Sequence, residues 1–403
     1  MTARDSRRHL LLRLLRAALA AVDGRARTRA ALEGRAGAVL ARAPAVRVAA
    51  VGKAAAAMAR GAHDALGARM ASCLVITKDG HVDPALRSLP GVEVLESGHP
   101  VPDQRSLDAG ARLLAFVRSA PPDTALVLLV SGGASSLAEV LAPGATLEDL
   151  RGLNLAGLAS GVAIGELNAR RRDISLIKGG RLLGQLGGRP ALALLLSDVP
   201  GDDPAVIGSG LAAAGPAGPD GVERVVVASI KDALCAVRTA AAGLEVEVSE
   251  TRFSQDAERL AVRFAHELHF SRVPLRVWGG ESVVRLPAQP GRGGRNQHLA
   301  LAVARIIAGD ERLVLLAAGT DGTDGVTDDA GALVDGDTCA RAMLAGLDVE
   351  DCLRRADSAT ALAAAGDLVH TGPTGTNVGD LVIGLKLAEA DARAWLAAQP
   401  AGR

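Results

Sequence analysis

The sequence of 403 residues contains no tyrosine, four phenylalanines and two tryptophans. Proteins that bind single-stranded nucleic acid stack the bases on aromatic side chains, so this scarcity argues against such a surface. Lysine plus arginine and aspartate plus glutamate both total 45, which gives a formal net charge of zero. A balanced charge gives no long-range attraction toward nucleic acid or an anionic membrane. We therefore expect neither as a partner.

Cysteine pairs are also missing. No CxxC pair occurs, which argues against a zinc site and against a disulfide framework. The four cysteines are Cys73, Cys235, Cys339 and Cys352.

No stretch reaches about 18 consecutive uncharged apolar residues, the length that spans a membrane. The N-terminal segment RRHLLLRLLRAALAAVDG is basic and could be compared with a transit or signal segment. Its apolar residues Leu11, Leu14, Leu15 and Ala18 instead recur at helical spacing, which favours an amphipathic helix. We expect a cytoplasmic protein.

Hydrophobic residues make up 49% of the chain, enough for a substantial core. Short apolar runs alternate with segments of helical pattern, which predicts βαβ units and a mainly parallel sheet. Continuous apolar runs suit strands covered on both faces. The predicted strands are 46–51, 73–77, 92–95, 125–130, 191–196, 224–228, 244–248, 275–278, 312–317, 331–334 and 381–385. The clearest helical patterns are 105–118, 147–160, 254–269 and 295–308.

A stretch rich in glycine, proline and alanine, residues 208–221, predicts a long loop or hinge. We place a domain boundary after it, which gives an N-terminal domain of residues 1–240 and a C-terminal domain of residues 241–403.

The six residues SGGASS, 131–136, directly follow the apolar run 125–130. Ligands of open α/β sheets bind at the carboxyl ends of strands, and glycines let backbone N–H groups approach an anion. A tight turn into a helix explains the same residues, and both interpretations stay open. Lys53 in VGK similarly follows the run 46–51 and precedes a predicted helix, whose N-terminus favours an anion.

Two phosphate-binding fingerprints are absent. The segment around Lys53 lacks the first glycine and the following hydroxyl of a GxxxxGK[ST] loop, and no GxGxxG with a downstream acidic residue occurs. A nicotinamide-dependent reductase would therefore lack its usual fingerprint. Ser131 also has no GxSxG elbow, which argues against a serine nucleophile.

Further polar, glycine-rich stretches follow other predicted strands. They contain basic residues, aspartates and turns rich in N–H groups, but no Cys/His pair. This combination suits metal-assisted phosphoryl transfer, in which the protein positions the substrates and neutralises phosphate charge. Each of these residues also has an ordinary explanation as a solvated face or a turn. The candidates are Arg170, Arg171, Arg172, Lys178, Ser197, Asp198, Asp202, Asp203, Arg295, Asp321, Asp324, Asp328 and Asp329, with the hydroxyl-rich turn 371–381.

The order of these stretches resembles the glycerate 2-kinase family, whose C-terminal part is known as the MOFRL domain. Ten motifs carry the resemblance over nearly the whole chain: VGKAA, GHPVPDQRS, LVSGGASSL, IGELNARRR, IKGGRL, SDVPGDDPAVIGSG, GGES, GRGGRNQ, GTDGTDGVTDDAGA and TGPTGTNVGDL.

The resemblance implies a fold and a reaction. It implies a Rossmann-like three-layer α/β/α N-terminal domain and a second α/β domain that contains the MOFRL region, about residues 312–398. It also implies ATP-dependent phosphorylation of D-glycerate at its 2-hydroxyl, with Mg²⁺, in a cleft between the two domains. D-glycerate is then the expected partner, and a homodimer is an open option for the assembly.

Carried over by motif, Lys53 and Arg295 look like the catalytic basic pair. We assign Lys53 to phosphate stabilisation and Arg295 to the glycerate carboxylate or the transferred phosphoryl group. The resemblance further implies nucleotide contacts, and Mg²⁺ binding or proton acceptance by either of two aspartates. The nucleotide set is Ser131, Gly132, Gly133, Ser135, Lys178, Gly179, Thr374 and Asn377, and the aspartates are Asp198 and Asp321.

Asp173, Leu211, His298 and Gly379 depart from the family pattern, which affects expectations of substrate preference and rate more than of reaction class. Two alternatives stay open: a hydroxypyruvate reductase that uses a nicotinamide cofactor, and a non-catalytic nucleotide-binding module.

Overall fold

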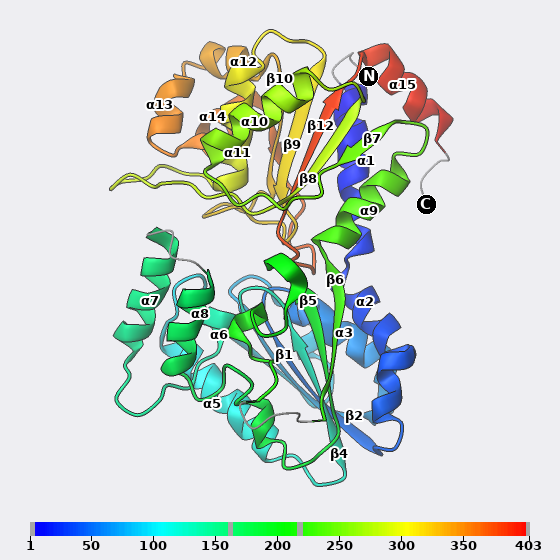
Figure 1. Cartoon of the computed structure of the whole chain (residues 1–403), viewed down its shortest axis with the longest axis vertical. Coiled ribbons are helices and arrows are strands. Elements are labelled where there is room, and N and C mark those ends of the chain that lie inside the picture. Colours follow the sequence, from blue (N-terminus) through cyan, green and yellow to red (C-terminus); the bar gives the residue numbers. More distant parts are fainter. Residues whose placement is uncertain (1–4, 160–163, 216–220, 400–403) are drawn as a thin grey trace. The chain divides into compact units, whose positions relative to one another are not determined.

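The computed structural model describes residues 5–159, 164–215 and 221–399, and the chain forms two compact units (Figure 1). The parallel-sheet unit consists of residues 22–229 and 375–378. The mixed-sheet unit consists of residues 1–21, 230–374 and 379–403. Both units are discontinuous in sequence, whereas the boundary predicted near residue 240 is a single division.

The parallel-sheet unit contains six strands in the order β3-β2-β1-β4-β5-β6, and every pairing in this sheet is parallel. This order is that of a Rossmann fold. The prediction of a Rossmann-like domain with a parallel sheet is confirmed here. The strands are β1 (Ala45–Val51), β2 (Met70–Lys78), β3 (Val92–Ser97), β4 (Thr124–Val130), β5 (Ala191–Ser197) and β6 (Glu223–Ser229).

Helices cover both faces of this sheet, which gives the three predicted layers (Figure 1). α3 packs on β1 and β2 of one face and against α2, with Gly61 so close that a Cβ there would lie 2.2 Å from the carbonyl oxygen of Arg25. On the other face, Leu113 and Phe116 of α5 join the core formed by alternate residues of β1, β2, β4 and β5. The helices are α2 (Gly24–Glu33), α3 (Ala55–Leu66), α4 (Pro84–Arg87), α5 (Gln104–Arg118), α6 (Ala134–Leu137), α7 (Leu147–Ala159) and α8 (Ile164–Asp173).

Two sequence predictions fall partly outside the described residues. Residues 216–220 of the predicted loop 208–221 and residue 160 of the predicted helix 147–160 lie there.

The mixed-sheet unit has the strand order β11-β10-β9-β12-β8-β7. Only β7 and β8 pair in parallel within the described residues, and the other pairings are antiparallel. The prediction of a mainly parallel sheet is therefore wrong for this unit, although its α/β class is confirmed. The strands are β7 (Val246–Val248), β8 (Leu275–Gly280), β9 (Leu313–Gly319), β10 (Gly331–Asp335), β11 (Leu368–Val369) and β12 (Asp380–Lys386).

This sheet is also covered on both faces. Leu313, Leu315 and Ala317 of β9 face the core made with α10 and α11, while α1 and α9 pack on the opposite side. The helices are α1 (Asp5–Ala21), α9 (Ile230–Ala240), α10 (Ala257–His269), α11 (Arg295–Ile306), α12 (Thr338–Leu344), α13 (Val349–Arg354), α14 (Ser358–Ala365) and α15 (Glu389–Ala398).

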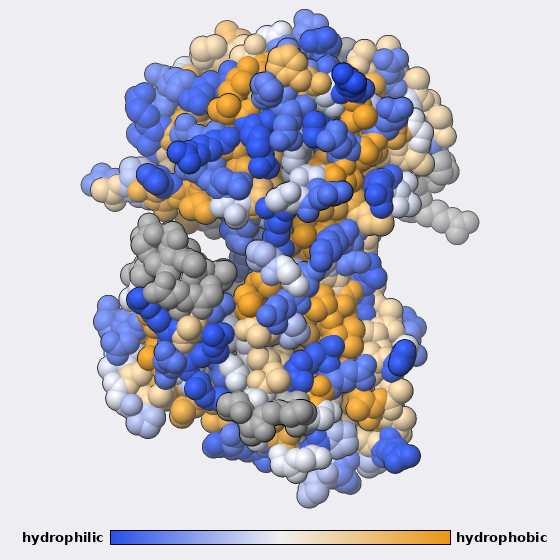
Figure 2. Space-filling view, viewed as in Figure 1, coloured by the Kyte–Doolittle hydropathy of each residue, from blue (hydrophilic) through white to orange (hydrophobic). Residues whose placement is uncertain are grey.

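The N-terminal amphipathic helix is confirmed as α1, and Leu11, Leu14, Leu15 and Ala18 are buried. Throughout the described parts of the chain, no helix combines the length and the apolar character needed to span a bilayer. Figure 2 shows apolar residues interspersed with hydrophilic ones on the face in view.

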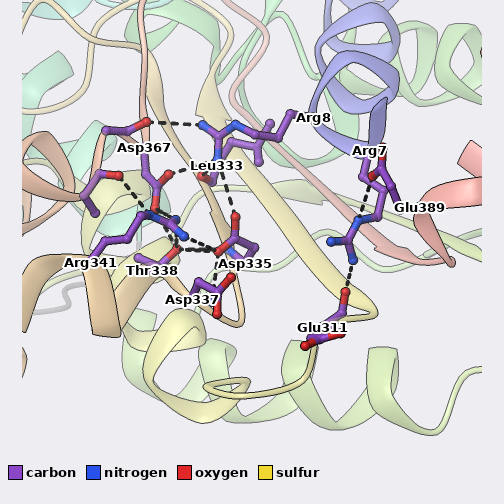
Figure 3. A network of polar contacts seen from close by, with 12 residues as sticks. Arg7, Arg8, Glu311, Leu333, Asp335, Asp337, Thr338, Arg341, Asp367 and Glu389 are labelled. Carbon is purple, nitrogen blue, oxygen red and sulfur yellow. Dashed lines mark hydrogen bonds and ion pairs between the residues drawn. The ribbon is translucent and has the colours of Figure 1, made fainter. Parts of the chain in front are cut away.

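A buried network of polar contacts fixes α1 in the mixed-sheet unit (Figure 3). Nη1 of Arg8 donates to Oδ1 of Asp367 at 2.9 Å and to the carbonyl oxygen of Leu333 at 3.0 Å. The Asp367 side chain is fully buried, and its other oxygen accepts from Arg341 at 2.6 Å. Arg341 also bonds Asp335 at 2.8 Å. Two arginines thus share one buried carboxylate.

Replacement of Arg8 by alanine is expected to destabilise the protein. Breaking a fully buried ion pair costs roughly 3 kcal/mol or more, and because Asp367 keeps Arg341 as a partner we expect a loss in the free energy of unfolding of about 2 kcal/mol. Arg354→Ala, which breaks an exposed pair with Asp351 in the same unit, is expected to cost at most about 1 kcal/mol. Urea unfolding of both variants is the measurement, and equal losses would contradict the role given to Arg8.

Candidate active site

The carboxyl ends of β1 and β4 are neighbours at the centre of the parallel sheet. The strand order reverses between them, since β2 and β3 lie beyond β1 while β5 and β6 lie beyond β4. Such a switch point is where open α/β sheets bind ligands. Lys53 follows β1, residues 131–136 follow β4, and Asp198 follows β5. The parallel sheet therefore brings three of the predicted segments to one edge.

The loops after β1 and β4 are in direct backbone contact. Lys53 N–H donates to the carbonyl oxygen of Gly132 at 2.9 Å, and Ala54 N–H donates to Oγ of Ser131 at 3.1 Å. Gly52 has φ +133°, and a Cβ there would lie 2.2 Å from Ser131 Oγ and 2.5 Å from its carbonyl oxygen. Only glycine fits this approach. Ser131 is fully buried and supports the start of α3, so phosphate contact by its hydroxyl stays a prediction.

Gly132 lies directly against two polar side chains, those of Asp198 and Asn377. Nδ2 of Asn377 donates to Oδ2 of Asp198 at 3.2 Å, and a Cβ on Gly132 would lie 1.9 Å from that oxygen and 2.0 Å from that nitrogen. Asn377 reaches this place because residues 375–378 belong to the parallel-sheet unit. Three predicted residues from distant parts of the sequence are thus in contact.

Gly133, the next residue, has φ +86°. A Cβ on it would lie 3.1 Å from Cγ of Lys53 and 3.1 Å from Nε2 of His99. The Lys53 side chain therefore passes beside the glycine loop. The N-terminus of α3, two residues beyond Lys53, adds a positive dipole end to the same edge. This edge is suited to an anion.

A cavity of about 180 Å³ adjoins the glycine loop. It is lined by His99, Pro100, Gly133, Ser135, Ser136, Asn154 and Arg171. Ser135 of the predicted nucleotide set is thus accessible from a cavity, whereas His99 and Asn154 were not among the predicted site residues.

Lys178 is placed differently from the prediction. Its side chain is about 1% exposed, and Nζ donates to Oε2 of Glu139 at 2.5 Å and to the carbonyl oxygen of Ser135 at 2.7 Å. Burial lowers the pKa of Lys178, and the adjacent Glu139 carboxylate opposes that shift. Its ammonium group holds the backbone of the glycine loop, which favours a positioning role over direct phosphate contact.

Three other predicted residues have local roles in the structure. Gly179 has φ +61°, and its N–H donates to the carbonyl oxygen of Ser209. Thr374 Oγ1 donates to the carbonyl oxygen of Thr320 at 2.5 Å. Asp321 is buried, and one of its carboxylate oxygens accepts from Thr323 N–H at 3.1 Å. Thr374 and Asp321 belong to the mixed-sheet unit.

Arg295 is the centre of a charged cluster in the mixed-sheet unit. Its Nε and Nη2 donate to the two oxygens of Asp380 at 2.7 and 3.0 Å, and Nη1 donates to Glu281. Burial disfavours the charge on Arg295, but Asp380 and Glu281 together raise its pKa above the ordinary value. The residues meet because β12 runs antiparallel to both β8 and β9, so that Asp380 pairs with Gly280 and Gly319.

Asp324 caps the helix that begins with Arg295. Its carboxylate accepts from the N–H groups of Asn296 and Gln297 at 3.1 and 2.7 Å. Asp324 is buried, and burial raises its pKa to about 7 despite these hydrogen bonds.

Among the residues that the structure describes, no three His, Cys, Asp or Glu side chains come together as a metal site. Mg²⁺ is commonly held by one or two carboxylates together with substrate phosphates. Asp198, oriented by Asn377 beside the glycine loop, fits that mode of binding.

Comparison with known proteins identifies the family of the chain. A family described as a domain of unknown function, DUF4147, matches residues 10–234, and the MOFRL family matches residues 275–380. D-glycerate 2-kinase of Thermotoga maritima is 36% identical over 327 residues, which cover 70% of this chain and 77% of that protein. The chain belongs to the glycerate 2-kinase family.

The family assignment extends to the fold. A crystal structure of the Thermotoga maritima glycerate kinase superposes with a TM-score of 0.81 at 33% identity, covering 95% of this chain and all of that one. A provisionally named hydroxypyruvate reductase of Agrobacterium vitis is 36% identical over 320 residues, 68% of this chain and 83% of that protein. Both names thus occur among the relatives.

Sequence reasoning missed the partners of the basic residues. Glu139 carried no motif signal, since its pairing with Lys178 spans 39 positions of sequence. Glu281 and Asp380 stood inside the quoted motifs GGES and TNVGDL, but nothing in the sequence linked them to Arg295.

Replacing Gly132 by alanine is expected to damage the site while leaving the fold intact. The new Cβ displaces the Asn377 and Asp198 side-chain ends, which are flexible, rather than backbone. We expect turnover in a glycerate kinase assay to fall more than about tenfold, equivalent to about 1.4 kcal/mol of transition-state stabilisation. Gly184→Ala, where a Cβ meets no atom within 4 Å, is the control. Equal activity of both variants, measured with their thermal unfolding, would contradict the placement of this pair.

Asp324→Asn is expected to change how stability depends on pH. With a folded pKa of about 7, Asp324 keeps its proton between pH 4 and 7, while the unfolded chain has released it. The wild type therefore loses stability as pH rises through this range, with a slope of up to about 1.4 kcal/mol per pH unit. The variant lacks this contribution. Urea unfolding at pH 4.5, 5.5, 6.5 and 7.5 measures the difference, and parallel pH profiles would refute the assignment.

Proposed function

We propose that this chain is a kinase that transfers the γ-phosphoryl group of ATP to the 2-hydroxyl of D-glycerate, giving 2-phosphoglycerate and ADP. The observation that carries the proposal is the edge of the parallel sheet at its switch point, where Lys53, the glycine loop 131–133, Asp198 and Asn377 come together. Membership in the glycerate 2-kinase family supports the same reaction. Location in the cytoplasm and assembly as a homodimer stay predictions.

In this proposal the phosphates lie against the glycine loop and the N-terminus of α3. Backbone N–H groups and the helix dipole favour negative charge there, and Lys53 adds a full positive charge. The bond between the γ-phosphorus and its bridging oxygen breaks as the substrate hydroxyl oxygen bonds to that phosphorus. Lys53 then stabilises charge on the transferred group. The hydroxyl proton passes to a carboxylate, for which Asp198 and Asp321 are the candidates.

Asp198 is our candidate for holding Mg²⁺ beside the phosphates. Its carboxylate, fixed by Asn377, provides the oxygen ligand that this cation prefers. A bound Mg²⁺ supplies neutralisation of phosphate charge.

The test is incubation of the purified protein with MgATP and D-glycerate, followed by phosphorus NMR to distinguish 2-phosphoglycerate from 3-phosphoglycerate. We expect 2-phosphoglycerate. Lys53→Ala is expected to lower kcat by about 100-fold or more, because a preorganised charge is removed from the transition state. Arg295→Ala is expected to lower kcat as well, on the role that the family resemblance implies for it. Lys231→Ala, an exposed lysine on α9, is the control and is expected to leave kcat unchanged.

Two results would overturn the proposal. NADH oxidation with hydroxypyruvate in the absence of ATP, with no phosphorylation of glycerate, would indicate a reductase. Binding of ATP without turnover of any acceptor would indicate a nucleotide-binding module. Normal activity of both alanine variants would remove the site assignment but not the reaction.

A further inference from the structure

The side chains that line the cavity beside the glycine loop favour one chemical class of ligand. Among the described residues that line it, Arg171 carries the fixed charge and none has a carboxylate. Its volume is about 180 Å³, well above the roughly 10–15 Å³ that a single water molecule needs. This is enough space for a molecule of three carbons with polar substituents.

Arg171 is held in place by neutral partners rather than by an acid. Its Nη2 donates to Oδ1 of Asn154, and its Nη1 donates to Oδ1 of Asn168 at 3.4 Å. Its buried Nε has no hydrogen-bond partner within the described chain. Burial lowers the pKa of Arg171, and the Glu139 carboxylate opposes this only in part. A guanidinium group without a paired acid is stabilised by an incoming anion.

Asn154 adds a second unused donor. It is about 3% exposed, and its Oδ1 is occupied by Arg171, so its amide nitrogen is directed elsewhere. That nitrogen is buried and has no partner among the described residues. A buried amide donor without a partner costs free energy, which a ligand that accepts a hydrogen bond would recover.

Serine hydroxyl groups line another part of the cavity. The direction of their hydrogen bonds shows which of these oxygens can still accept a hydrogen bond from a ligand. Oγ of Ser209 donates to Oδ1 of Asn168 at 3.0 Å. The 2.8 Å contact between Ser135 and Ser209 is therefore donated by Ser135, whose oxygen keeps lone pairs. Oγ of Ser136 likewise donates to the carbonyl oxygen of Gly133. The cavity thus combines donors for a carboxylate with acceptors for a hydroxyl.

We propose that this cavity binds the acceptor substrate, a small 2-hydroxy acid, with its carboxylate on Arg171 and Asn154 and its hydroxyl groups toward Ser135 and Ser136. This proposal rests on the proposed glycerate kinase activity and deepens it. The carboxylate of the substrate is thereby assigned to Arg171 instead of Arg295. In the structure, the Nε and Nη2 edge of Arg295 that would clamp a carboxylate is already bonded to Asp380.

Asn154→Asp is the sharpest test, because it keeps the shape of the side chain and the oxygen that Arg171 bonds. It replaces the unused donor by a negatively charged acceptor, which repels a carboxylate. Arg171→Met removes the guanidinium group. Losing a hydrogen bond to a charged group weakens binding roughly 10- to 150-fold, so we expect KM for D-glycerate to rise by that factor in both variants, with KM for MgATP unchanged.

A neutral analogue of the substrate distinguishes recognition of the carboxylate by Arg171 from a purely structural role of Arg171. Glyceramide carries an uncharged amide in place of the carboxylate, so Arg171→Met is expected to lower kcat/KM for D-glycerate more than tenfold relative to kcat/KM for glyceramide. A merely structural role would lower both equally. Arg118→Met, an exposed arginine at the end of α5, is the control and is expected to leave both values unchanged.

Calorimetry of D-glycerate binding needs no turnover and separates the two proposals. Binding by the wild type that Asn154→Asp abolishes would support this site even if no phosphorylation occurs, in which case the proposed function alone fails. A rise in KM for MgATP with an unchanged KM for glycerate would assign the cavity to nucleotide phosphate instead. Unchanged glycerate binding in both variants would overturn the inference.

Discussion

The candidate site depends on the close approach of two loops, at Gly52 and Ser131. The parallel pairing of β1 and β4 delivers both loops to one edge, and the absence of a side chain at Gly52 lets them touch. Ser131 can then accept a hydrogen bond from Ala54, and Gly132 one from Lys53. These backbone contacts fix the Cα of Lys53 beside the glycine loop, so that its side chain starts from a defined position.

Much of the fold could be predicted because its strands are buried on both faces. The apolar runs at 125–130 and 191–196 became β4 and β5, and each predicted strand is present within a few residues of its expected bounds. Strand direction in the second sheet could not be read, because apolar runs look alike in parallel and antiparallel strands. β12 runs antiparallel to both neighbours, so the turn that precedes it lies at the same end of the mixed sheet as the carboxyl ends of β8 and β9.

The site was predictable to the level of segments but not of contacts. Motif order selected Lys53, Asp198 and Asn377 as candidates, and in the parallel-sheet unit the last two are hydrogen-bonded. The partners of the other basic residues depended on folding across long stretches of sequence, as with Lys178 and Glu139. Arg171 and Lys178 come from one basic segment, yet one lines a cavity and the other is enclosed by protein. Composition alone cannot separate such neighbours.

The return of residues 375–378 to the parallel-sheet unit has a consequence for biogenesis. A ribosome that has made the first 229 residues has supplied all six strands of that sheet but not Asn377. The first helix meanwhile belongs to a unit whose sheet is synthesised last. Neither unit can therefore reach its final form during early translation, and a chain interrupted before residue 375 would leave Asp198 without its amide partner. The contact between Asp198 and Asn377 can therefore form only after nearly the whole chain has been synthesised.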